Sequence, residues 1–126
     1  MQLLLDTHTF LWWSEASPQL PAPFRTAIAQ RTNDVFVSAV TVWEIGIKRR
    51  TGKLAFSGQI PGAIERLGFK PLPIAIAHAE AVELLPLLHR DPFDRMLIAQ
   101  AEVERMILLT LDTQMMRYAP KLLPTS

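Results

Sequence analysis

Cysteine is absent from the sequence, and its absence removes several classes of protein. A chain without thiols has no disulfide framework, no thiolate zinc site and no cysteine nucleophile. The composition suits a reducing compartment, so we expect a cytoplasmic protein.

Long apolar runs are also missing. The longest stretch without a charged residue runs from Leu54 to Ile64 and contains Gly58, Pro61 and Gly62. A membrane-spanning helix needs about 20 apolar residues. No basic residue precedes the short apolar run in Met1–Asp6. We therefore expect neither a membrane span nor a signal peptide.

Charge of one sign is not in excess, because the formal net charge is +1. A role with nucleic acid has to rest on local patches such as Lys48–Arg50, or Arg90 with Arg95, although a run of charges is also typical of a solvated helix face. What is present describes an ordinary globular chain of 126 residues, 49% hydrophobic and 20% charged. This size predicts one domain over residues 1–126.

Short apolar runs alternate with segments of helical spacing along the chain. The runs typical of buried strands are Gln2–Leu5, Val35–Val37, Lys70–Ile74 and Ile107–Leu109. Helical spacing is found at Thr9–Ser14, Ala22–Gln30, Ala39–Arg50, Gln59–Leu67, Ala75–Leu85 and Pro92–Arg105, with a last short helix from about Asp112. This order predicts an α/β fold with a parallel, helix-covered sheet, whose ligands bind beyond the carboxyl ends of the strands.

Two aspartates follow predicted strands at that edge. Asp6 comes directly after Gln2–Leu5, and Asp112 comes just after Ile107–Leu109. Each of them alone is more commonly a loop or helix-capping residue. Together they place two carboxylates at the same edge of the predicted sheet.

Glu44 lies on the strongest predicted helix, where Val40, Trp43, Glu44 and Ile47 fall on one stripe. A glutamate on such a stripe should face inward or toward a cleft. Because a buried glutamate needs a partner, either a cation or a basic residue must meet it. Lys48, four residues on, offers an ion pair as the simpler explanation.

Asp94 opens another predicted helix, in which Asp91 is the expected N-cap and Pro92 the first residue. Taken alone, Asp91 and Asp94 are explained by the helix N-terminus, where each acid contributes about 0.3–1 kcal/mol.

The four acids together indicate a metal site. Two like charges about 4 Å apart repel by roughly 4 kcal/mol at an effective dielectric near 20. A cleft with several carboxylates therefore needs a divalent cation or raised pKa values. Magnesium prefers oxygen ligands and binds through carboxylates together with substrate phosphates. Metal-assisted phosphodiester hydrolysis is the chemistry that this arrangement favours.

Four motifs then occur in a recognisable order and cover essentially the whole chain. They are Leu3–His8 with Leu11-Trp12, Ser38–Lys48 with Gly52-Lys53-Leu54, His89–Ala101, and Leu109–Asp112. With these motifs the chain resembles the PIN-domain family, and within it the VapC-type toxin ribonucleases of bacterial toxin–antitoxin pairs. The run Asp91-Pro92-Phe93-Asp94-Arg95 is the most specific part of the resemblance.

The resemblance implies a three-layer α/β/α fold with a central parallel sheet. It implies that Asp6, Glu44, Asp94 and Asp112 surround one or two Mg²⁺ ions, with Mn²⁺ as a substitute. It also implies an RNA substrate, often tRNA or ribosomal RNA, a small VapB-type antitoxin as partner, and a homodimer. Asp6 and Asp94 would be the principal metal ligands, and Glu44 and Asp112 would complete the outer shell or orient the attacking water.

Other polar side chains near these motifs have alternative interpretations. Thr7 and Thr110 could hydrogen-bond a ligand carboxylate or a metal-bound water. As hydroxyls near strand ends, they could instead only cap the local backbone. Basic candidates for RNA phosphate contacts are Arg95, Lys48 and Arg90. His8 and His89 could act as general acids or bases, although hydrolysis by a bound metal does not need them.

The aromatic residues Trp12, Trp13 and Trp43 could stack on bases. Packing in the core, or in an antitoxin groove, is the better explanation for all three tryptophans.

Three other functions remain open. A phosphate-accepting signalling domain would have a pair of acidic residues after the first strand, where Asp6 stands alone. An RNase H-like nuclease would begin with a hairpin sheet, and no hairpin turn signal follows Asp6. A catalytically inactive PIN-like module that binds RNA or protein would keep the fold without the chemistry, although all four acids are present here.

Overall fold

The computed structural model describes residues 1–125, in which four strands form one parallel sheet. The strands are β1 (Gln2–Leu5), β2 (Asp34–Ser38), β3 (Lys70–Leu72) and β4 (Ile107–Leu109). Their order across the sheet is β3-β2-β1-β4, so the first strand lies inside the sheet. Leu3, Leu4 and Leu5 are fully buried, as expected for a parallel strand covered on both faces.

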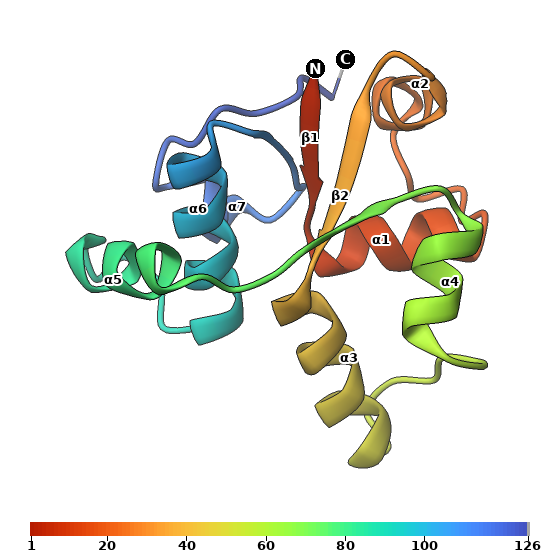
Figure 1. The fold of residues 1–126 in the computed structure, drawn as a ribbon, viewed down its shortest axis with the longest axis horizontal. Helices are drawn as coiled ribbons and strands as arrows, with labels where there is room; N and C mark the ends of the chain where they lie inside the picture. The colour runs from red at the N-terminus through yellow and green to blue at the C-terminus, as the bar shows by residue number, and fades with distance from the viewer. Residues whose placement is uncertain (126) are drawn as a thin grey trace.

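Helices cover both faces of this sheet (Figure 1). The helices are α1 (Thr7–Ser14), α2 (Ala22–Ala29), α3 (Ala39–Arg50), α4 (Ile60–Arg66), α5 (Ile76–Leu84), α6 (Pro92–Glu104) and α7 (Thr113–Met116). Because side chains alternate along a strand, Leu3 and Leu5 pack in one apolar cluster with residues of α1, α2 and α4. Leu4 packs in a second cluster with residues of α6 and α7. The predicted three-layer α/β/α architecture is therefore confirmed.

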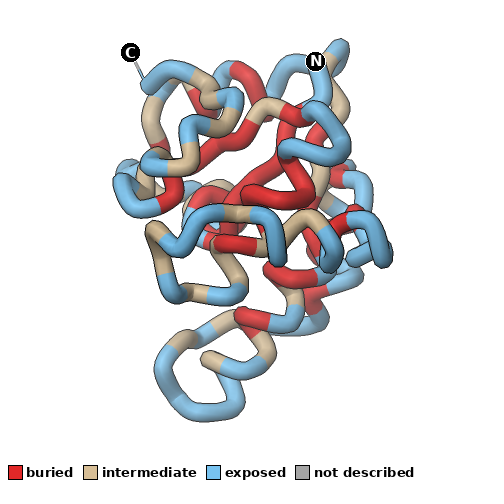
Figure 2. The backbone as a smooth tube through the Cα atoms, turned by 90° about the vertical axis from the view of Figure 1, so that its left-hand side faces the viewer, coloured by how far each residue is buried: buried red, intermediate tan, exposed pale blue. Residues whose placement is uncertain are grey.

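Buried backbone gathers in the middle of the molecule, and the exposed turns lie around it (Figure 2). Within the part of the chain that is described, no helix combines the length and the apolar character that a membrane crossing requires.

Most element boundaries agree with the sequence prediction to within one residue, and the two that differ by two residues have local reasons. The third strand ends at Leu72 rather than Ile74, where Pro73 cannot donate a ladder hydrogen bond. The first helix begins at Thr7 rather than Thr9. Asp6 is its N-cap and accepts a hydrogen bond from the backbone N–H of Thr9 at 2.8 Å.

The predicted stripe on α3 is only half correct. Val40 and Glu44 are buried, but Trp43 and Ile47 are 59% and 40% exposed. The buried side of the helix also includes Thr41 and Ile45. The inward face is therefore rotated away from the position that the sequence spacing predicts, and Trp43 lies at its outer edge.

The strand register brings the carboxyl ends of three strands together. Leu5 at the end of β1 pairs with Val37 of β2 and with Leu109 of β4. The next residue along each strand then lies at the same edge of the sheet, and α1 and α3 start there (Figure 1).

Candidate active site

Asp6 is buried at the carboxyl end of β1 and is 4% exposed. One carboxylate oxygen caps α1, and the other accepts a hydrogen bond from the Thr110 hydroxyl at 2.6 Å. Burial raises the pKa of Asp6 above its usual range, and the hydrogen bonds from Thr110 and Thr9 act in the opposite direction. The carboxylate is thus held by two donors in a poorly solvated position.

Glu44 is also 4% exposed and reaches the same edge from α3. Its Oε1 accepts a hydrogen bond from the Thr7 hydroxyl at 2.6 Å, and its Oε2 forms an ion pair with Lys48 Nζ at 2.6 Å. The expectation that a basic residue meets Glu44 is therefore confirmed. Thr7 follows Asp6 directly, so this hydrogen bond ties the start of α1 to α3.

Asp94 lies in the first turn of α6, behind the N-cap Asp91, as the sequence predicts. Its Oδ2 lies 2.8 Å from His89 Nε2. The pKa of Asp94 is raised to about 6, mainly because burial disfavours the charge. The hydrogen bond with His89 lowers the pKa, whereas the negative charges of Asp91, Asp112 and Glu44 raise it further. Asp94 is therefore surrounded by other acids.

Asp112 follows β4 and is the N-cap of α7, where it accepts a hydrogen bond from the Gln114 backbone at 2.8 Å. Its own backbone N–H donates to the Thr110 hydroxyl at 3.0 Å. Asp112 and Asp6 line the same small pocket of about 170 Å³. Thr110 thus links the two aspartates that come from neighbouring strands.

These contacts bring the predicted acids to one edge of the sheet. Ligand atoms of His89, Asp94 and Asp112 all lie within 4.8 Å of one another. Asp6 and Glu44 lie outside this tightest group, but Asp6 shares a pocket with Asp112, and the charge of Glu44 acts on Asp94. Their placement agrees with the sequence prediction, and their role as ligands stays a prediction.

The residues of this site fit a divalent cation. The donor set is rich in carboxylate oxygens, which hard cations prefer. Lys48 and His89 are the basic side chains that contact these acids. Burial raises the pKa of Asp6 and of Asp94, and neighbouring acids raise the pKa of Asp94 further. A cation held between Asp94 and Asp112 would stabilise the charged form of these poorly solvated carboxylates.

Arg95 does not face a substrate, and its interpretation as an RNA phosphate contact is wrong. The residue is only 9% exposed. Its guanidinium donates hydrogen bonds to the carbonyls of Val82, Leu85 and Pro86 and to the Tyr118 hydroxyl. Arg95 therefore holds the loop that precedes α6, because a guanidinium can satisfy several carbonyls at once.

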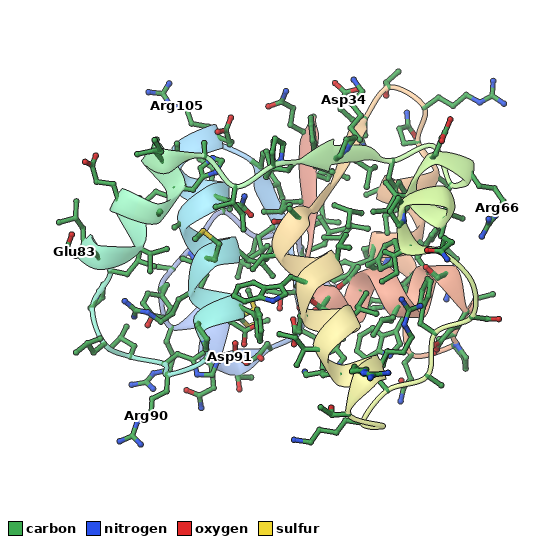
Figure 3. The ribbon with its side chains drawn as sticks, turned by 60° about the horizontal axis from the view of Figure 1, so that its bottom comes forward. Asp34, Arg66, Glu83, Arg90, Asp91 and Arg105 are labelled. Atoms are coloured by element: carbon green, nitrogen blue, oxygen red, sulfur yellow. The ribbon has the colours of Figure 1, made fainter. Side chains whose placement is uncertain are left out.

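The other two basic candidates, Lys48 and Arg90, differ in whether an acidic side chain already binds them. Lys48 Nζ is bound to Glu44, and the pKa of Lys48 is raised mainly by this hydrogen bond, with further contributions from the charges of Asp91 and Asp94. Arg90 is exposed, and its side chain extends outward beside Asp91 at the start of α6 (Figure 3). Arg90 thus remains a candidate for phosphate contacts.

The tryptophans divide into two groups. Trp12 and Trp13 are partly buried against the core, in line with the packing interpretation. Trp43 is largely exposed and meets Phe93 edge-on, with ring centroids 5.1 Å apart. Trp43 therefore does not belong to the core.

The contact between His89 and Asp94 is the feature that sequence reasoning missed. The two residues are five positions apart and on opposite sides of the N-cap Asp91. No rule of helical spacing pairs side chains across a helix start. A histidine just before an acid-rich helix start was the available signal.

The fold and the site together define a small parallel α/β protein with carboxylates gathered at the carboxyl edge of its sheet. A family model described as the PIN domain matches residues 3–121. The chain therefore belongs to the PIN domain family, and this membership supports a nuclease role. Among curated proteins, no sequence matches the chain significantly.

Several solved structures contain chains with a similar fold. VapBC2 from Rickettsia felis, bound to a DNA fragment from their promoter, has a chain that is 14% identical, with a TM-score of 0.70 and coverage of 98% of this chain and 96% of that chain. FitAcB from Neisseria gonorrhoeae is 19% identical, with a TM-score of 0.66 and coverage of 98% and 97%. VapBC-1 from nontypeable Haemophilus influenzae is 14% identical, with a TM-score of 0.65 and coverage of 97% and 96%. At these identities the likeness concerns the fold.

Proposed function

We propose that this chain is a metal-dependent endoribonuclease and the toxin of a VapBC-type toxin–antitoxin pair, acting in the cytoplasm as one PIN-like unit. The observation that carries the proposal is the meeting of Asp6, Asp94 and Asp112 beyond the carboxyl ends of β1 and β4. Membership of the PIN domain family supports the same chemistry.

The proposed cation is Mg²⁺, with Mn²⁺ as a substitute. When bound, such a cation lowers the pKa of a coordinated water and stabilises charge on the phosphate. Asp6 and Asp94 would be its principal ligands, Asp112 would be a further ligand beside Asp94 or complete the outer shell, and Glu44 would orient the attacking water. Thr110 and Thr7 hold Asp6 and Glu44 by hydrogen bonds. They therefore fix the direction of the carboxylates before substrate arrives.

The proposed substrate is RNA, with tRNA or ribosomal RNA as the expected target. Exposed Arg90 lies two positions before the start of α6 and next to Asp91 (Figure 3), so it can contact phosphates. The resemblance to VapC-type toxins supports RNA over DNA.

A small antitoxin and a second copy of the chain are the proposed partners. The similar solved structures include VapBC2, VapBC-1 and FitAcB. Ile76, Leu84 and Leu87 lie on α5 or just after it and are 88%, 83% and 90% exposed, so a partner could cover apolar surface there. Sedimentation velocity at micromolar concentration should show a dimer. A monomer at every concentration would refute the dimer and leave the nuclease proposal standing.

Cleavage of structured RNA tests the nuclease proposal directly. The purified chain should cut RNA with Mg²⁺ and stop when a chelator is added. Asp6→Asn and Asp94→Asn keep the shape of the side chain but remove the charge, so each should lower the rate by roughly a hundredfold or more if it removes an essential metal ligand.

Asp34→Asn is the matched control for these variants. Asp34 lies at the amino end of β2 and pairs with Lys70, at the opposite end of the strand from the site. This variant should cut at the wild-type rate. If Asp6→Asn and Asp94→Asn also cut at that rate, the assignment is wrong, and a folded wild-type chain that binds RNA without cutting it would point to a binding module.

A further inference from the structure

The backbone around His89 is held next to the acids by hydrogen bonds with Tyr118 and Arg117. Its backbone N–H donates to the Tyr118 hydroxyl at 3.0 Å, and the N–H of Leu88 donates to the same oxygen at 3.2 Å. Arg117 donates to the Leu88 carbonyl at 2.6 Å. The imidazole is therefore placed by the fold, and its contact with Asp94 is more than a chance meeting of two surface side chains.

The geometry of His89, Asp94 and Asp112 is that of a ligand set. Their ligand atoms lie within 4.8 Å of one another, and His89 Nε2 lies 2.8 Å from Asp94 Oδ2. Two neighbouring ligands of one cation, with bonds of about 2.1 Å at right angles, are about 3 Å apart. A cation can therefore enter between these atoms with little movement of either side chain.

We propose that His89 is a nitrogen ligand of the cation that Asp94 and Asp112 hold, so that this position binds Mn²⁺ in preference to Mg²⁺. The inference rests on the proposed function and specifies its metal site. Imidazole suits transition metals, whereas Mg²⁺ prefers oxygen ligands and retains its waters. A site with one nitrogen and two carboxylates consequently discriminates between the two cations.

The other histidines of the chain make the assignment testable. His78 is buried, with Nδ1 bonded to the Ala75 backbone N–H and Nε2 to Glu104. His8 is exposed and stacked on Trp12, and it lines the pocket that contains Asp6 and Asp112. The chain has three histidines and no cysteine. A coordinated imidazole at this site must therefore come from His89 or from His8.

Electron spin-echo spectroscopy of the full chain with Mn²⁺ tests for this nitrogen. A directly coordinated imidazole modulates the echo at nitrogen frequencies. The modulation should be present in the wild type, absent in His89→Gln and unchanged in His8→Gln. Glutamine keeps an N–H₂ donor that can reach Asp94, so a purely structural role of His89 would survive the substitution while imidazole ligation would not.

Calorimetric titration provides the second readout. His89→Gln should weaken Mn²⁺ binding by roughly tenfold or more and weaken Mg²⁺ binding less. His8→Gln changes a neighbour of the site rather than the proposed ligand, so it should alter the two affinities by the same factor and leave the preference for Mn²⁺ unchanged. Circular dichroism melting of each variant confirms that it is folded.

The outcomes separate this inference from the proposed function. Mn²⁺ that binds in an Asp94-dependent way without a coordinated nitrogen would overturn the role of His89 and leave the metal site intact. Modulation that survives in His89→Gln and disappears in His8→Gln would also overturn it. A wild-type chain that binds neither cation at millimolar concentration would overturn both proposals.

Discussion

Each buried carboxylate of the site receives a hydrogen bond from a buried threonine. Thr110 serves Asp6 and Thr7 serves Glu44, both at 2.6 Å. A hydrogen bond to a charged group is worth more than one between neutral groups. The threonines thus stabilise acids that burial would otherwise penalise.

Replacing Thr110 by valine tests this role. Valine keeps the shape of the side chain but leaves one oxygen of Asp6 and the backbone N–H of Asp112 without a partner. The free energy of unfolding, measured by urea denaturation, should fall by about 1–3 kcal/mol. Thr110→Ser keeps the hydroxyl and should lose less. A Thr110→Val variant that is as stable as the wild type would contradict this role of the hydroxyl.

The raised pKa of Asp94 makes stability depend on pH. Because its pKa rises from 3.8 to about 6 on folding, the folded chain holds the Asp94 proton more tightly than the unfolded chain does. The stability that this proton contributes is fully present below about pH 4 and is lost as the pH rises through about 6.

The Asp94→Asn side chain cannot ionise, so the variant should not lose stability as the pH rises through about 6. In metal-free buffer, the difference in unfolding free energy between variant and wild type should shift in favour of the variant between pH 4 and pH 7, on the order of 1–3 kcal/mol. Loss of the contact with His89 opposes the gain at both pH values. Melts that show the same difference at pH 4 and at pH 7 would contradict the raised pKa.

Local rules explain which single residues could be predicted. The N-cap Asp91 and the pair of Glu44 with Lys48 depend on neighbours within one helical turn, and both agree with the structure. Arg95 depends instead on carbonyls of a loop and on Tyr118, twenty-three positions away. Such partners have no spacing rule, so its burial could not be predicted.

At the scale of elements, the carboxyl edge of the sheet was predictable because parallel strands end together. Asp6 and Asp112 follow β1 and β4, which pair directly. The orientation of α3 was not predictable from spacing, because Thr41 and Ile45 are also buried and rotate its inner face. A continuous apolar surface around a helix leaves its inward direction undetermined.

The loop between α5 and α6 depends on one hydroxyl. Tyr118 accepts hydrogen bonds from the N–H groups of Leu88 and His89 and from Arg95. Tyr118→Phe removes this acceptor and should lower the free energy of unfolding by about 1–2 kcal/mol. Amide exchange should accelerate at Leu88 and His89 but not in β1. Exchange that is unchanged in the loop would show that Arg95 alone holds it.

At the scale of the whole molecule, an acidic cluster lies within a chain whose net charge is only +1. Lys48 forms an ion pair with Glu44, and His89 contacts Asp94, so only part of the cluster has a basic partner. The remaining negative charge lowers stability, and a ligand that binds only the folded state should restore it.

Thermal melting with Mg²⁺ therefore tests the cluster as a unit. Binding to the folded state alone adds about 2.7 kcal/mol at a hundred times Kd, so millimolar Mg²⁺ should raise the Tm of the wild type by several degrees. NaCl at matched ionic strength should raise it less, because screening acts on all charges rather than at one site. The increase in Tm caused by Mg²⁺ should be smaller in Asp94→Asn and unchanged in Asp34→Asn. A melt that does not respond to Mg²⁺ beyond the NaCl control would mean that these carboxylates are stable without a cation and that the pocket beside Asp6 and Asp112 has no metal to hold.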